Sequence, residues 1–208
     1  MILFAILLTA CGTEENGQEK KFETTKQAPT AEVIQKEPSE KVKNEVNVST
    51  TKKIETYAKN IFKLTTIEGK TLHVDEAENG IIFQEHKDKM VFLIFFGYRC
   101  PPCLSEIPVL KKLVEEKGDK LEVIALEVQR LPEEQLKIFK DSKKLNYTIL
   151  SGEHTENSKF ISYIAERSQW TGSIPFLVGI KPSGEVGVVH VGGIGSHEFN
   201  KIFNELSK

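Results

Sequence analysis

Residues 90–108 read MVFLIFFGYRCPPCLSEIP. The first seven of them form a continuous apolar run without polar alternation, which is typical of a central strand buried on both faces. From residue 102 to residue 117, apolar side chains recur at helical spacing. The motif Cys100-Pro101-Pro102-Cys103 lies where the run ends and the helical pattern begins. The stretch therefore predicts a buried strand that leads directly into a helix, with two cysteines at the helix N-terminus.

This placement predicts a reactive first cysteine. The N–H groups and the dipole of a helix N-terminus stabilise negative charge, so we expect the pKa of the Cys100 thiol to lie below its usual value of about 8.5. Cys103 lies one turn into the helix, less exposed, and close enough to form a disulfide with Cys100. Pro102 stands where a missing N–H costs nothing and fixes the helix start. We expect a nucleophilic thiol and a resolving thiol, which together exchange disulfides.

Two structural roles fit the cysteine pair less well. A zinc site would need two more soft ligands, but the only other cysteine is Cys11, and the five histidines show no paired ligand spacing. A purely structural disulfide would close so short a loop that it would constrain the unfolded chain little. We therefore predict that the dithiol itself does the chemistry, with no metal and no bound cofactor.

The sequence from residue 54 to residue 208 alternates strand and helix patterns. A β-hairpin is predicted at residues 61–64 and 71–74, around a turn at Glu68-Gly69. Further strands are predicted at residues 121–128, 147–150, 176–180 and 185–191. Further helices are predicted at residues 132–143 and 156–166, and at the C-terminus behind a Ser196 cap. This order predicts an α/β domain with three α/β/α layers, a mixed central sheet and an N-terminal β-hairpin extension.

Composition excludes two classes of protein. Among the 208 residues, 28 are Lys or Arg and 30 are Asp or Glu, which gives a net charge of −2. A nucleic-acid-binding protein would need a basic stripe, so we expect no nucleic-acid partner. No apolar run reaches the roughly 18–20 residues that a membrane-spanning helix requires, so the chain is not predicted to be an integral membrane protein.

The N-terminus indicates export. Residues 1–10 are almost wholly apolar and close on small residues, as the signal of an exported protein does, although no Lys or Arg precedes the run. The string Leu8-Thr9-Ala10-Cys11 resembles a bacterial lipobox, in which the cysteine is diacylated and becomes the first mature residue. We therefore predict a signal peptide at residues 1–10 and lipidation of Cys11. The lipid would attach the protein to the bilayer on the outside of the cell, facing the periplasm in a Gram-negative bacterium.

A polar spacer follows the predicted lipid. Residues 12–53 contain eight Glu and eight Lys, and their few apolar residues show no sustained helical or strand period. Such a segment cannot bury enough surface to offset its ordering entropy, so we expect residues 11–53 to form a disordered tether. The domain itself is predicted at residues 54–208.

The segment at residues 95–108 resembles the active-site segment of thioredoxin-like proteins, specifically the TlpA/ResA branch of extracytoplasmic thiol–disulfide reductases. The resemblance covers roughly residues 58–208 and implies a thioredoxin-like fold. In that branch the glutamate three residues after the second cysteine is a functional acid, and here it is Glu106. On a helix Glu106 falls on the same side as Cys103, where a half-buried carboxylate could manage the Cys103 proton during exchange. Pro108 matches the helix-kinking proline of the fold.

The same resemblance implies that Pro175 is cis and lies opposite the cysteines, just before the fourth strand of the sheet. The preceding residue, Ile174, could then offer its backbone groups to an incoming peptide as an added strand. Two features depart from the family pattern. Arg99 stands where Trp is common, and its cation should lower the pKa of Cys100 and make the couple more oxidising. Pro101 and Pro102 lack the His seen in strong oxidants, which argues in the opposite direction.

These features predict a lipid-anchored thiol–disulfide oxidoreductase that reduces protein disulfides, for example in cytochrome c maturation. Its partners would be protein thiol and disulfide substrates and a membrane electron-donor thiol protein that re-reduces the pair. Two alternatives stay open. The same fold could act as a thiol oxidase or isomerase. The two thiolates could also bind Cu(I), as in a copper chaperone, because soft ligands select that ion.

Overall fold

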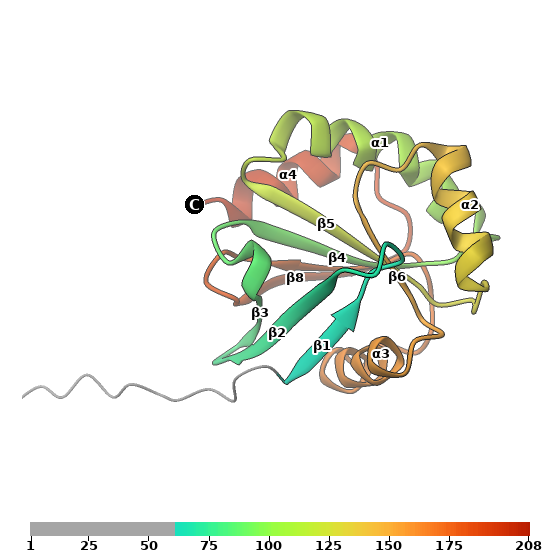
Figure 1. Cartoon of the computed structure of the whole chain (residues 1–208). Coiled ribbons are helices and arrows are strands. Elements are labelled where there is room, and N and C mark those ends of the chain that lie inside the picture. Colours follow the sequence, from blue (N-terminus) through green and yellow to red (C-terminus); the bar gives the residue numbers. More distant parts are fainter. Residues whose placement is uncertain (1–60) are drawn as a thin grey trace, which may run out of the picture. The chain divides into compact units, whose positions relative to one another are not determined.

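A mixed five-stranded sheet lies at the centre of residues 61–208, the part of the chain that the computed structural model describes (Figure 1). The predicted signal peptide, Cys11 and the predicted tether lie outside the described residues. The strand order is β6-β5-β4-β7-β8, with β4 parallel to β5 and antiparallel to β7. The strands span Met90–Phe96 (β4), Leu121–Glu127 (β5), Thr148–Ser151 (β6), Phe176–Ile180 (β7) and Val186–Val191 (β8).

Strand β4 is central because its sequence can be buried on both faces. All seven of its residues are buried, and alternate side chains enter two separate core clusters. Phe92 and Phe96 point into one cluster, and Leu93 and Phe95 point into the other. The predicted bounds of this strand are confirmed to the residue.

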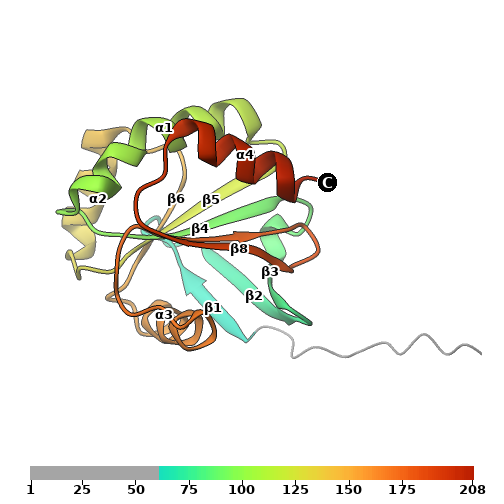
Figure 2. The ribbon, with the colours of Figure 1, turned by 180° about the vertical axis from the view of Figure 1, so that it is seen from behind.

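Helices cover both faces of the sheet, as Figures 1 and 2 show from opposite sides. Helices α1 (Pro101–Lys117), α2 (Glu133–Lys143) and α4 (Ser196–Leu206) lie on one face, and α3 (Thr155–Ser168) lies on the other. We call the cluster under α1, α2 and α4 the α1-side core and the cluster under α3 the α3-side core. The predicted α/β/α layering and mixed sheet are confirmed.

The N-terminal extension is a three-stranded antiparallel sheet packed beside α3. It contains β1 (Phe62–Thr65), β2 (Thr71–Ala77) and β3 (Gly80–Phe83), followed by the short 3₁₀ helix η1 (Gln84–His86). The predicted hairpin is the β1–β2 pair, and the sequence analysis missed β3. Isolated bridges from Thr66 to Leu150 and from Gly80 to Glu185 join the small sheet to the large one.

A buried amide side chain fastens the extension to the main domain. Asn157 in α3 is fully buried, and its amide nitrogen donates to the carbonyl oxygens of Thr65 and Ser151, both at 2.9 Å. Its amide oxygen accepts the Thr65 N–H at 3.0 Å. One side chain therefore connects α3 with the ends of β1 and β6.

The prolines of α2 and α1 lie where the sequence analysis placed them, whereas the predicted cap of α4 does not. Pro132 is the N-cap of α2, and Pro108 lies inside α1. The predicted Ser196 cap is wrong, because Gly195 occupies the N-cap position and Ser196 is the first helical residue, without a side-chain capping hydrogen bond.

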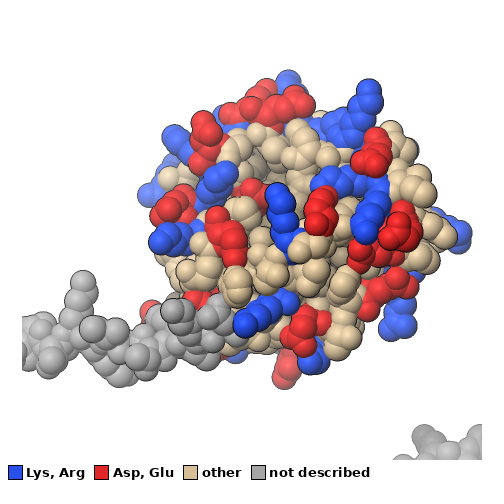
Figure 3. Space-filling model, in the orientation of Figure 1, with Lys and Arg blue, Asp and Glu red and all other residues tan. Residues whose placement is uncertain are grey.

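Among residues 61–208, no helix combines the length and the apolar character needed to cross a membrane. On the face shown in Figure 3, acidic and basic side chains are interspersed, without a large area of one sign.

Candidate active site

The two cysteines lie at the junction of β4 and α1. Cys100 is the N-cap residue of α1, and the helix begins at Pro101, one residue earlier than predicted. Cys100 and Cys103 form a disulfide, with their Cα atoms 5.2 Å apart. Cys100 is 7% exposed and Cys103 is 4% exposed, so the oxidised pair presents little sulfur to solvent. The strand-to-helix placement that the sequence predicted is confirmed.

The helix N-terminus directs one backbone donor at the first sulfur. The N–H of Cys103 lies 3.4 Å from Sγ of Cys100, which accepts it as an N-cap side chain does. Pro101 and Pro102 occupy the first two helical positions and have no N–H. An N-cap side chain accepts from the second or the third helical position, so Pro102 removes one donor and leaves that of Cys103. The α1 terminus can stabilise a Cys100 thiolate, with fewer donors than a proline-free turn would supply.

The loop before β7 lies against the Cys100 sulfur. The peptide bond between Ile174 and Pro175 is cis, as predicted. The carbonyl oxygen of Ile174 lies 3.7 Å from Sγ of Cys100. Trp170 supports this loop, because its indole N–H donates to the Ser173 carbonyl at 2.6 Å and its ring packs edge-on against Phe95 at 4.9 Å. The chain therefore brings Ile174 and Cys100 together across 74 residues of sequence.

A buried carboxyl group lies one helical turn beyond Cys103. Glu106 is 3% exposed, which is more complete burial than the half-buried position that we expected. Its Oε1 accepts the N–H of Ile194 at 2.6 Å. Burial raises the pKa of Glu106 to about 7, and the Ile194 N–H opposes this rise. A group that titrates near neutral pH can both accept and donate a proton under physiological conditions.

The remaining predicted residues lie around this centre. Arg99 is exposed, and its guanidinium carbon lies 4.9 Å from the centroid of the Tyr98 ring. Its effect on the pKa of Cys100 stays a prediction. Pro101 and Pro102 are exposed at the start of α1, and a Cβ atom on Gly193 would lie 3.5 Å from Pro102. The loop after β8 therefore lies beside the start of α1.

Sequence analysis missed a second buried carboxyl group near the cysteines. Glu127 ends β5, is fully buried, and accepts the N–H groups of Gln129 at 3.0 Å and Leu131 at 2.9 Å. The available signal was a glutamate within the apolar run that predicted this strand. Val128 after it donates its N–H to the Phe96 carbonyl at 2.9 Å, which ties the loop after β5 to the end of β4.

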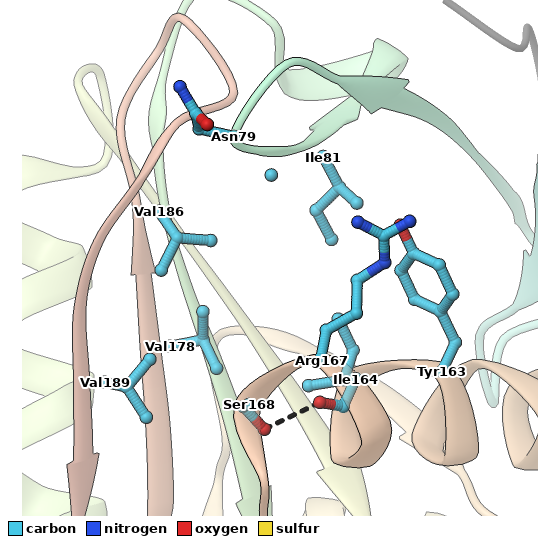
Figure 4. A pocket seen from close by; sticks show the side chains of 10 residues that line it. Asn79, Ile81, Tyr163, Ile164, Arg167, Ser168, Val178, Val186 and Val189 are labelled. Atoms are coloured by element: carbon cyan, nitrogen blue, oxygen red, sulfur yellow. Dashed lines mark hydrogen bonds between the residues drawn. The ribbon is translucent and has the colours of Figure 1, made fainter. Parts of the chain in front are cut away.

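The apolar pocket shown in Figure 4 lies away from the cysteines. It has a volume of about 300 Å³ and lies between α3, the β2–β3 turn and the outer strands. Its buried walls, including Ile81, Ile164 and Val178, belong to the α3-side core, whereas both cysteines belong to the α1-side core. This pocket is therefore not part of the dithiol site.

Comparison with known proteins assigns the family. Residues 54–189 match the model of the AhpC/TSA family. The chain belongs to the AhpC/TSA family. Within this family it resembles ResA, a thiol–disulfide oxidoreductase of Halalkalibacterium halodurans, with 30% identity over 71% of this chain and 73% of ResA. The predicted similarity to TlpA/ResA-type proteins is confirmed, and the chain is a thiol–disulfide oxidoreductase.

Two further matches agree with this assignment. The thioredoxin-like protein YneN of Bacillus subtilis is 38% identical over 32% of this chain, and the match spans only 41% of YneN. The exposed lipoprotein thioredoxin of Streptococcus pneumoniae superimposes with a TM-score of 0.52 and 20% identity, over 72% of this chain and all of that one. The second match shows that this AhpC/TSA-family chain shares the thioredoxin-like fold.

Proposed function

We propose that this chain reduces disulfides in protein substrates outside the cytoplasmic membrane, attached to the bilayer by a lipid on Cys11. The observation that supports disulfide exchange at this site is its geometry. A sulfur at a helix N-terminus lies 3.7 Å from a backbone carbonyl, and an acid with a pKa of about 7 lies one turn beyond the second cysteine. The dithiol supplies the electrons, so the reaction needs no bound cofactor.

The proposed exchange has two steps. The Cys100 thiolate attacks one sulfur of the substrate disulfide, forms a mixed disulfide, and releases the other substrate sulfur as a thiol after protonation. Cys103 then loses its proton to the Glu106 carboxylate and attacks Sγ of Cys100, which releases the second substrate thiol. The substrate gains two electrons and two protons, and the pair Cys100–Cys103 becomes a disulfide.

Ile174 supplies the place where a substrate backbone would bind. Its carbonyl borders the Cys100 sulfur, so a peptide that pairs with Ile174 as an added strand would bring its own disulfide to that sulfur. Apocytochrome c is one substrate class that could bind in this way, with the residues beside its cysteines paired to Ile174 as an added strand. A membrane thiol protein would then reduce the Cys100–Cys103 disulfide and restart the cycle.

The reduction potential tests the direction of electron flow. The full chain carrying Cys11→Ser leaves Cys100 and Cys103 as the only thiols, and it can be equilibrated against thiol redox buffers and alkylated. A potential near or below about −250 mV supports a reductase. A potential above about −180 mV would instead assign the chain as an oxidase or isomerase.

The anchor needs a separate test. Labelled fatty acid should be incorporated into the native chain but not into the Cys11→Ser variant, and only the native chain should sediment with membranes. The match to an exposed lipoprotein thioredoxin of Streptococcus pneumoniae supports this part of the proposal. Equal labelling of the two chains would reject lipidation at Cys11.

A further inference from the structure

The carboxylate of Glu127 accepts backbone N–H groups from the loop after β5 and lies close to the segment before α1. Its two oxygens accept the N–H groups of Gln129 and Leu131, in the loop that joins β5 to α2. The N–H groups of Arg130, in the same loop, and of Tyr98, just before α1, also lie close enough to this carboxylate to favour its ionised form. Burial raises the pKa of Glu127, and these four N–H groups oppose the rise.

The contact with Tyr98 reaches the segment that leads into the redox centre. Tyr98 precedes Cys100 by two residues, and the next N–H, that of Arg99, donates to the side-chain oxygen of Gln129 at 3.0 Å. The N–H of Cys100 donates to the Gly97 carbonyl at 3.1 Å. The N–H groups of Arg99 and Cys100 are therefore both hydrogen-bonded, and that of Arg99 is held by a side chain from the loop after β5.

Close packing supports the same arrangement. A Cβ atom on Gly97 would lie 2.3 Å from the side chain of Gln129, so only a glycine lets Gln129 approach this closely. Arg130 adopts a left-handed conformation with φ 60°, which a non-glycine residue adopts rarely. The loop after β5 therefore folds around Glu127 and packs against the segment before Cys100.

A carboxylate suits this position better than an amide would. An ionised carboxylate only accepts hydrogen bonds and has about four lone-pair sites, enough for the N–H groups of Gln129 and Leu131 and for the two others that lie near it. A glutamine would turn an NH₂ group toward some of the same donors and leave them unpaired. The position therefore calls for an acceptor with no donor of its own.

We propose that Glu127 is a positioning residue for disulfide exchange, which orders the loop after β5, positions Arg99 through Gln129, and so fixes the Cys100 sulfur beside Cys103. This inference rests on the proposed exchange by Cys100. The reduced state should depend on it most, because breaking the disulfide leaves the position of Cys100 to the loop hydrogen bonds. With a loose loop, ring closure must also order the loop, so the disulfide becomes less stable relative to the dithiol.

The test compares reduction potentials in the full chain carrying Cys11→Ser. Glu127→Gln is expected to lower the disulfide-forming equilibrium constant about tenfold against glutathione, which is a rise of about 30 mV. Gln129→Ala changes no charge and should shift the potential in the same direction, whereas Gln129→Glu keeps an acceptor and should restore most of the native value. In the double variant the two shifts should fall short of additivity, because both side chains fix one segment.

Glu122→Gln is the matched control, because Glu122 lies at the other end of β5 and accepts from the Thr148 hydroxyl. Thermal unfolding separates positioning from folding. A lower midpoint with an unchanged potential would show that Glu127 only stabilises the fold and would overturn the inference. If Glu127→Gln does not fold, the exposed Gln129→Ala variant decides alone: an unchanged potential rejects the inference. Failure of the native chain to reduce protein disulfides would reject the proposed function while leaving the potential shifts interpretable.

Discussion

The backbone N–H of Ile194 donates a 2.6 Å hydrogen bond to Oε1 of Glu106, although the two residues are 88 positions apart in sequence. This bond joins the buried face of α1 to the loop between β8 and α4. It is also the hydrogen bond that opposes the rise in the pKa of Glu106. One N–H is too little to offset the loss of hydration, so the carboxyl group titrates near pH 7 instead of near 4.5.

Replacement of Glu106 should slow the second step of exchange. Glu106→Gln removes the group that accepts the Cys103 proton, so release of substrate from a mixed disulfide on Cys100 should slow by on the order of 100-fold. The native rate should rise as pH increases through about 7, because the ionised form accepts the proton. Single-turnover release between pH 5 and pH 9 measures both effects. Glu115→Gln, on an exposed site of the same helix, is the control, and an unaltered profile in Glu106→Gln would exclude this role.

The same carboxyl group should make stability depend on pH. Its pKa is higher in the folded state than in the unfolded state, so its contribution is fully present below about 4.5 and is lost as pH rises to about 7. A difference of about 2.5 units corresponds to roughly 3 kcal/mol of unfolding free energy. Denaturant unfolding of the oxidised protein at pH 4.5 and pH 8 should show this loss in the native chain and not in Glu106→Gln. Parallel curves for the two proteins would argue against it.

Adding a backbone N–H at the start of α1 should stabilise the Cys100 thiolate. Pro102→Ala adds a donor at the second helical position, where it can reach the N-cap sulfur. We expect a lower pKa for Cys100 and a reduction potential higher by about 30 mV, equivalent to a tenfold change in the equilibrium constant. Pro101→Ala adds an N–H at the first helical position, which does not point at the sulfur, and should change little. Thiolate absorbance during a pH titration distinguishes the two variants, and identical titrations would refute the expected difference.

Removing the amide of Asn157 should weaken the attachment of the N-terminal sheet. Asn157→Ala leaves three backbone groups of Thr65 and Ser151 without their partner, and we expect a loss of roughly 2–4 kcal/mol of unfolding free energy. Urea titration followed by circular dichroism measures the loss. The exposed Asn204→Ala on α4 should be neutral within about 0.5 kcal/mol. Because Asn157 lies in the α3 layer, the reduction potential of the folded variant should stay unchanged.

The sequence predicted the elements whose signal is local. The apolar run of β4 and the helical period after Pro102 each lie within one segment, so their periodicity was enough to place the cysteines at a strand-to-helix junction. Strand β3 offers only three apolar residues after Gly80, and the cap of α4 depended on one residue of register. Short elements and element ends are set by neighbours elsewhere in the fold.

Contacts between distant segments were the harder part of the site. Resemblance to a family indicated Glu106 and Pro175, but nothing in the sequence showed that Ile194 would bind the first. Glu127 looked like a residue at the edge of an apolar strand. Its burial became visible only in the structure, because the N–H groups that compensate a buried carboxylate come from the loop that folds around it.

The low exposure of Cys100 and Cys103 limits the access of thiols in solution to their disulfide. A thiolate must approach a disulfide along the line of the two sulfurs, and in the oxidised protein Cys100 is only 7% exposed and lies beside Ile174. Small thiols in the medium would react slowly by that route, whereas a protein that docks on the Ile174 loop brings its sulfur into line. The redox state of the Cys100–Cys103 pair would then be set by the proteins that dock on the Ile174 loop, and not by the average redox state of the medium.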